Sequence, residues 1–225
     1  MAIEIPALVG FTSKEFRLVY KQQLTAVSAG YIQTADRADP FWIAQYQTNP
    51  LRDDQYDAAI AFLDSLQGSR NSFLGYDPRR PMPRAYQTQP LGNNPLVQAG
   101  YPNLIIGEAD YTSQGVALYR VAVGAVFTAG DYLSWLDVDN VWNLHRVKQT
   151  VVAASNGPVA VSVEPRPKPF FHAGPPSTDW MTGYAVRYRK ACAEMKMIGN
   201  YKETDSVDSK PVLSWQATQF NNRSV

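Results

Sequence analysis

A single amphipathic helix in an otherwise β-rich sequence is the feature that most limits the fold. Within residues 48–78, apolar side chains recur at helical spacing and form one stripe: Tyr56, Ala59, Ile60, Leu63 and Leu66. Asp53 and Asp54 favour the dipole of the predicted first turn, and Gly68 follows as a C-terminal cap. The apolar run 72–76 then reads as a strand. The sequence therefore predicts a strand, helix, strand unit in a β protein.

Composition narrows the class of protein. The 225 residues include 21 basic and 20 acidic residues, and the net charge of +1 gives no global field toward nucleic acid or a membrane. The single cysteine, Cys192, rules out an internal disulfide and is expected to be a buried, small apolar residue. We expect no secretory signal in residues 1–11 and no membrane insertion, because no apolar run approaches 18 residues.

Strands are predicted on both sides of the helix. Before it, alternation predicts strands at 16–21, 31–34 and 41–48, with a polar turn at 35–40. Near the C-terminus, 212–220 is a last strand, 200–210 reads as a loop, and 181–189 fits helix or strand. Residues 191–198 alternate, and one face carries small and apolar side chains: Ala191, Ala193, Met195 and Met197.

Two proline-rich segments, 76–84 and 164–170, bracket a run of short predicted strands. These strands are expected at 116–123, 132–136, 141–147, 150–154 and 159–163. Asn156-Gly157 indicates a hairpin between the last two. Several short strands in so few residues fit a small OB-like β-barrel.

We therefore predict a mainly β fold with one α-helix and two domains. Residues 1–84 and 171–225 would form a discontinuous β-sandwich. Residues 85–170 would form the inserted OB-like barrel between the proline-rich hinges.

No catalytic, cofactor-binding or metal-binding residue is expected. The two histidines, His145 and His172, lie in different predicted domains, and Cys192 offers no second thiol for zinc. Nucleotide-binding and hydrolase motifs are absent from the sequence. Asp131, Asp137 and Asp139 could form a carboxylate pair or a Ca²⁺ site, but aspartate is also what turns prefer.

Two groups of side chains leave a binding role open. Basic runs at 79–84 and 187–190 could hold phosphate, or could be solvated charges beside a linker. Tyr132, Trp135 and Trp142 could form a stacking platform for sugars or bases, or could pack in the core.

The succession of motifs resembles the distal tail proteins of long-tailed bacteriophages, of the type with an OB-like domain inserted in a tail-tube-like sandwich. The resemblance covers about residues 14–170. It rests on FRLVY, GYIQTADRADPFWIAQYQT, LRDDQYDAAIAFLDSLQG, SFLGYDPRRPMP, TAGDYLSWLDVDNVWNLHRV and NGPVAVSVEPRPKP in this order.

The resemblance implies a structural virion protein at the tail tip, made in the host cytoplasm. Such a protein forms a hexameric ring that joins the tail tube protein to a baseplate hub or tail fibre protein, and DNA passes through the ring without specific binding. We expect the contacts between subunits in three segments: 2–14, 24–40 and 200–210. Two other classes stay open: a carbohydrate-binding module on the host surface, using Tyr132, Trp135 and Trp142, and an envelope hydrolase using Asp137 and Asp139.

Overall fold

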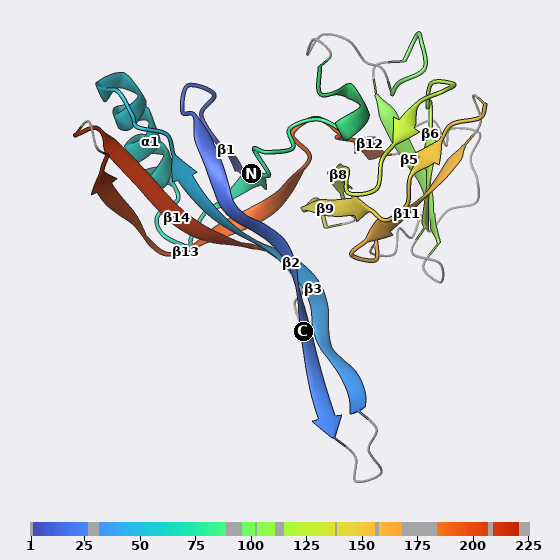
Figure 1. The fold of residues 1–225 in the computed structure, drawn as a ribbon, viewed down its shortest axis with the longest axis horizontal. Helices are drawn as coiled ribbons and strands as arrows, with labels where there is room; N and C mark the ends of the chain where they lie inside the picture. Colours follow the sequence, from blue (N-terminus) through green and yellow to red (C-terminus); the bar gives the residue numbers. More distant parts are fainter. Residues whose placement is uncertain are drawn as a thin grey trace. The chain divides into compact units, whose positions relative to one another are not determined.

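The computed structural model has a mainly β fold with one α-helix, as the sequence predicts (Figure 1). It describes residues 2–26, 32–88, 96–101, 103–110, 115–137, 139–155, 158–167, 184–206 and 209–220. The chain divides into two compact units. The barrel unit comprises Met1–Ile5, Phe73–Glu194 and Asn222–Val225, and the sheet unit comprises Pro6–Ser72 and Met195–Asn221. The expected domain boundaries after residues 84 and 170 both fall within the Phe73–Glu194 segment of the barrel unit.

A six-stranded sheet runs in the order β1-β4-β13-β14-β3-β2. Its strands are β1 (Ile3–Glu4), β2 (Phe11–Ala26), β3 (Ile32–Thr48), β4 (Ser72–Tyr76), β13 (Cys192–Asp205) and β14 (Pro211–Gln219). The β2–β3 ladder is antiparallel and extends from Phe11 opposite Thr48 to Ala26 opposite Ile32. Strand β14 pairs with only part of β3, from Ile43 to Gln47. Before Trp42, β3 is therefore paired with β2 alone among the described strands.

The predicted helix is α1 (Asp53–Ser65). Ala59, Phe62 and Leu63 are buried on its inner face, and the Phe62 ring lies 6.4 Å from the ring of Trp215 on β14. Gly68 has a φ of +68°, which suits a residue without a side chain just after a helix. Of the predicted stripe, Ala59, Leu63 and Leu66 are buried and Tyr56 and Ile60 are partly buried, and Phe62 is a buried residue that the stripe did not include. Within the described ranges, no helix is long and apolar enough to cross a bilayer.

The barrel unit contains a nearly closed, barrel-like sheet of six strands in the order β12-β5-β6-β11-β9-β8. Ser134 on β8 and Arg187 exchange backbone hydrogen bonds of 2.8 and 2.7 Å, which join the two ends of this order. Its strands are β5 (Leu104–Asp110), β6 (Gly115–Tyr119), β8 (Tyr132–Leu136), β9 (Trp142–Val147), β11 (Val159–Glu164) and β12 (Tyr184–Val186).

Shorter elements complete the barrel unit. Strands β7 (Val126–Phe127) and β10 (Val151–Val152) pair with each other, and a short 3-10 helix, η1, spans Arg84–Tyr86. The core inside the barrel is built from aliphatic side chains and three aromatic rings, those of Phe127, Trp135 and Tyr188. This core shows that the unit has its own apolar interior.

Three local predictions are wrong. Residues 35–40, expected as a turn, belong to β3, because β2 pairs with them and register shifts between Val19 and Gln22 absorb the extra residues of β3. Residues 200–205, expected in a loop, continue β13, since they pair with β14. The two strands flanking Asn156-Gly157 do not pair with each other: β10 pairs with β7, and β11 with β6 and β9. The Asn156-Gly157 turn itself lies outside the described residues.

Phe62→Ala should lower the free energy of unfolding by about 3–5 kcal/mol, because it removes a buried ring that packs on Trp215. Denaturant unfolding followed by tryptophan fluorescence measures this change. Asp64→Ala, on the exposed side of the same helix, is the control and should change stability by less than about 0.5 kcal/mol. Equal effects of the two substitutions would contradict the packing of α1 on β14.

Candidate functional site

The three aromatic residues proposed as a sugar platform do not share one surface. Tyr132 and Trp135 are only 6% and 1% exposed, and the Trp135 ring stacks on His145 at 4.0 Å. Trp135 stands opposite Asn143 in the β8–β9 ladder, so Trp142, one residue along, points to the other face. Tyr132 and Trp135 therefore pack in the core and do not form a stacking platform. Sugar contact at the half-buried Trp142 stays a prediction.

Trp142 is covered by a guanidinium group. The Cζ atom of Arg187 lies 5.1 Å from the centre of the Trp142 ring. Arg187 also donates to Glu4 Oε1 at 3.2 Å and to the sulfur of Cys192 at 3.3 Å. This member of the second basic run is thus engaged with groups of the barrel unit. Cys192 is buried as expected, and burial raises the pKa of its thiol.

Asp137 forms the turn between β8 and β9. Its Oδ1 accepts the backbone N–H groups of Asp139 and Val141, both at 2.9 Å, and its Oδ2 accepts from the Asn143 amide at 2.7 Å. The carboxylate is 1% exposed. Of the two interpretations of Asp137, a turn residue or a metal ligand, these contacts are those of a turn residue. Among the described residues, no group of three or more acidic, histidine or cysteine side chains could hold a metal ion.

Asp131 ties the first proline-rich segment to the barrel. Its Oδ1 accepts the N–H of Arg84 at 2.8 Å, and its Oδ2 accepts the N–H of Thr128 at 2.7 Å. Burial raises the pKa of Asp131, and the two N–H groups act in the opposite direction. Lys190 adds a second link to the proline-rich segment by donating its backbone N–H to the carbonyl of Pro81 at 2.7 Å.

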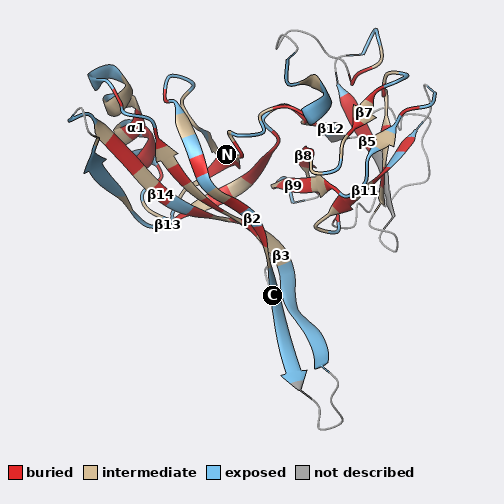
Figure 2. Ribbon diagram, in the orientation of Figure 1, coloured by how far each residue is buried: buried red, intermediate tan, exposed pale blue. Residues whose placement is uncertain are grey.

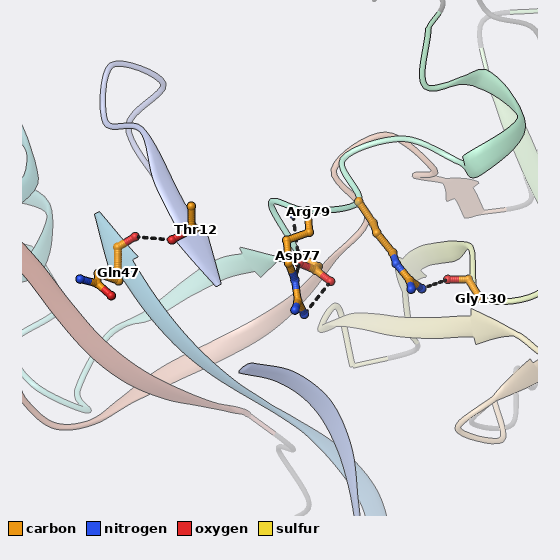
Figure 3. A network of polar contacts seen from close by, with 6 residues as sticks. Thr12, Gln47, Asp77, Arg79 and Gly130 are labelled. Atoms are coloured by element: carbon orange, nitrogen blue, oxygen red, sulfur yellow. Dashed lines mark hydrogen bonds and ion pairs between the residues drawn. The ribbon is translucent and has the colours of Figure 1, made fainter. Parts of the chain in front are cut away.

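The first basic run is also engaged by protein acceptors. Arg79 donates through its backbone N–H and its Nε to Asp77 Oδ1, each at 3.1 Å (Figure 3). Arg80 Nη1 donates to the carbonyl of Gly130 at 3.1 Å. These contacts position the guanidinium groups along the linker. They indicate a structural role for Arg79 and Arg80.

His145 is a buried, neutral imidazole. Its Nδ1 lies 2.8 Å from the carbonyl oxygen of Pro165, and since a carbonyl only accepts, Nδ1 carries the proton. Its Nε2 is buried with no hydrogen-bond partner. Burial lowers the pKa of His145 from 6.5 to about 4. These contacts give His145 the structural role that the sequence predicts. His172 lies outside the described residues.

The most exposed regular structure in the sheet unit is the outer part of the β2–β3 ladder, which we call the arm. It comprises residues 21–25 of β2 and 32–39 of β3, and all of these residues are exposed (Figure 2). Beyond the part of β3 that β14 pairs with, β2 and β3 continue together as a two-stranded ribbon (Figure 1). At about 3.4 Å per residue, the eight exposed residues of β3 give it a length of roughly 25 Å.

Side chains bridge the two strands of the arm. Gln22 donates to Asp36 at 2.8 Å, and Arg37 donates to Gln23 at 2.7 Å. The sequence indicated a subunit-contact segment at 24–40 but as a loop, because Asp36, Asp39 and Pro40 are typical of turns. Leu24 falls on the same alternate series as Phe16, Leu18 and Tyr20, which only Gln22 interrupts, and this series was the signal that could have revealed the arm.

Comparison with known protein families and with curated proteins finds no match for this chain.

Asp137→Ala should lower the free energy of unfolding by about 3 kcal/mol, because buried donors of the β8–β9 turn lose their acceptor. Asp139→Ala, at the exposed position of the same turn, should cost less than about 1 kcal/mol. Thermal unfolding with and without Ca²⁺ measures both effects. A Ca²⁺-dependent rise in stability that Asp137→Ala abolishes would restore the metal-site alternative.

Acid should destabilise the protein through His145. Its folded pKa of about 4 lies below its ordinary value of 6.5, so the unfolded state binds more protons between these values. Stability from this group is complete above pH 6.5 and is lost as the pH falls toward 4, by about 3 kcal/mol in all. Denaturant unfolding at a series of pH values measures the slope. His145→Asn, which keeps a donor but cannot titrate, should flatten it, and an unchanged slope would contradict this assignment.

Proposed function

We propose that this chain is a structural virion protein of a long-tailed bacteriophage, which forms a hexameric ring at the distal end of the tail tube. The observation that carries the proposal is the arm, a long exposed β ribbon on a compact sheet. The order of motifs resembles that of distal tail proteins and therefore suggests which assembly this is. The exposed arm gives a physical reason for the chain to assemble.

The arm is an unfavourable structure for an isolated subunit. A two-stranded ribbon without further packing is marginally stable in water. The arm exposes Leu24 and Ile32 to 67% and 72% of their surface. Both strands also present backbone edges that no described strand covers along the arm. Free edges pair readily with another chain, so an arm of this kind suits contact with a neighbour.

A ring requires this type of asymmetric contact. Subunits in a closed ring meet through two different surfaces, one protruding and one receiving. The arm protrudes from the sheet unit, and the outer edge of β2 nearer the sheet is a strand edge able to receive it. Repeating one such contact around an axis gives a ring with a central opening.

The proposed partners follow from the position in the tail. One face of the ring would contact the tail tube protein, and the other a baseplate hub or tail fibre protein, while DNA passes through the opening. Lysine and arginine contacts to phosphate would retard DNA. The net charge of +1 and the engagement of Arg79 and Arg80 with protein acceptors favour passage without binding.

The proposal is tested by the mass and shape of the purified protein in solution. Light scattering over a range of concentration should detect a species of about six times the 25.1 kDa monomer, and negative-stain images should show closed rings with a central hole. Purified tail tubes, added at low protein concentration, should carry the ring at one end. Assemblies that are dimers or open filaments, with no binding to tube ends, would overturn the proposal.

A further inference from the structure

Arg187 carries a guanidinium group that the barrel unit holds in a fixed position. Its backbone exchanges two hydrogen bonds with Ser134 on β8, at the place where the ends of the barrel-like sheet meet. Its Nη1 donates to the buried sulfur of Cys192 at 3.3 Å, and its Cζ lies 5.1 Å from the centre of the Trp142 ring. A planar guanidinium held at its backbone, at one nitrogen and at one face loses little freedom when it binds a further group. Arg187 is therefore preorganised to bind a carboxylate through Nη2.

The group that Nη2 contacts within the chain is the carboxylate of Glu4, at 3.2 Å. The side chains of Arg187 and Glu4 are 36% and 70% exposed, and exposed ion pairs of this kind are weak. Glu4 lies on β1, a strand of two residues that pairs with β4 alone among the described strands. Glu4 is thus a loosely held occupant of the guanidinium. It shows which group Arg187 accepts, and a carboxylate from outside the chain can replace it.

Trp142 gives the same place an apolar ring. It is half-buried, and the β8–β9 register directs it away from the barrel interior, where Trp135 lies. An indole beside a guanidinium offers a flat apolar surface and a charged hydrogen-bond donor. Sugar rings that carry a carboxylate use both features, because their C–H faces pack on aromatic rings and their carboxylate pairs with arginine. One guanidinium beside one indole therefore matches a ligand with one carboxylate on one ring.

We propose that Arg187 and Trp142 form a binding site for an acidic sugar of the uronic acid class, and that Glu4 occupies this site until such a sugar displaces it. The carboxylate of the sugar accepts from Arg187 Nη2 in place of Glu4 Oε1. The sugar ring packs on the exposed part of the Trp142 indole. Arg187 stays in place during the exchange because Ser134 and Cys192 hold it. The site does not depend on the proposed ring.

Ligand-observed NMR titration of the full chain with galacturonic acid measures the affinity. Because this method observes the sugar, it works for a monomer and for an assembled ring, so its result and that of the ring experiment are separate. We expect a Kd on the order of millimolar for the wild type, as suits a single guanidinium contact. The methyl ester of galacturonic acid has the same ring without the charge and should bind at least about 10-fold more weakly.

Glu4→Gln removes the internal occupant. Loss of a competitor should lower the Kd for galacturonic acid by about 3-fold, whereas a residue with only a structural role would leave the Kd unchanged or raise it. Glu15→Gln is the matched control, because Glu15 is also a glutamate paired with an arginine, Arg17, and its substitution removes the same charge. This control should change the Kd by less than about 1.5-fold.

Arg187→Gln should weaken binding at least about 10-fold, both alone and combined with Glu4→Gln. The midpoint of denaturant unfolding checks that this variant folds, and Glu4→Gln tests the proposal without altering Arg187. Three results would each overturn the proposal: a Kd that Glu4→Gln leaves unchanged or raises, equal binding of the methyl ester, or no binding by the wild type and Glu4→Gln at about 20 mM sugar. A glutamate-rich peptide that binds more tightly than galacturonic acid and responds to the same variants would overturn the sugar as the ligand.

Discussion

The antiparallel ladder between β2 and β3 is the interaction on which the sheet unit depends. In the core it sets Phe16 opposite Ala44 and Leu18 opposite Trp42, and the rings of the diagonal neighbours Phe16 and Trp42 lie 5.4 Å apart. Further out, the same backbone hydrogen bonds hold the arm extended where no described side chain covers it. One ladder therefore provides both a folded core and a surface that needs a partner. A change that shifted its register by one residue would exchange the two faces and expose the core.

Local patterns predicted the elements whose periodicity matches their burial. The helix, β4, the β8–β9 hairpin and the buried face of β13 all follow from side chains close in sequence. The turn expected at 35–40 was wrong because Asp36, Asp39 and Pro40 favour turns locally, whereas the distant strand β2 supplies hydrogen-bond partners and the register shifts accommodate the proline. Long-range pairing of this kind outweighs local preference and cannot be seen in one segment.

Some residue roles in the candidate site could likewise be predicted from local sequence, and others could not. Aspartate at turns and a buried histidine are predictable from residue chemistry, and Asp137 and His145 show those roles. The separation of Trp135 and Trp142 onto opposite faces depends on strand register, which the sequence did not supply. The exposure of Leu24 could not be predicted from the sequence for a different reason. Leu24 falls at the same alternate positions of β2 as the buried Phe16 and Leu18, and only the complete sheet shows that no strand or helix among the described residues packs on it.

The pairing of β14 with β3 also sets an order of events during synthesis. Trp42 and Gln219 are hydrogen-bonded although 177 residues separate them, so the sheet unit closes only after Gln219 has left the ribosome. Closing so long a loop costs entropy that local contacts do not repay. The intervening Phe73–Glu194 segment has its own core and is free to fold first, which shortens the effective loop. Until then, the β2–β3 ribbon has unpaired backbone edges and exposes Leu24 and Ile32, and such a segment is prone to pair with other unfinished chains.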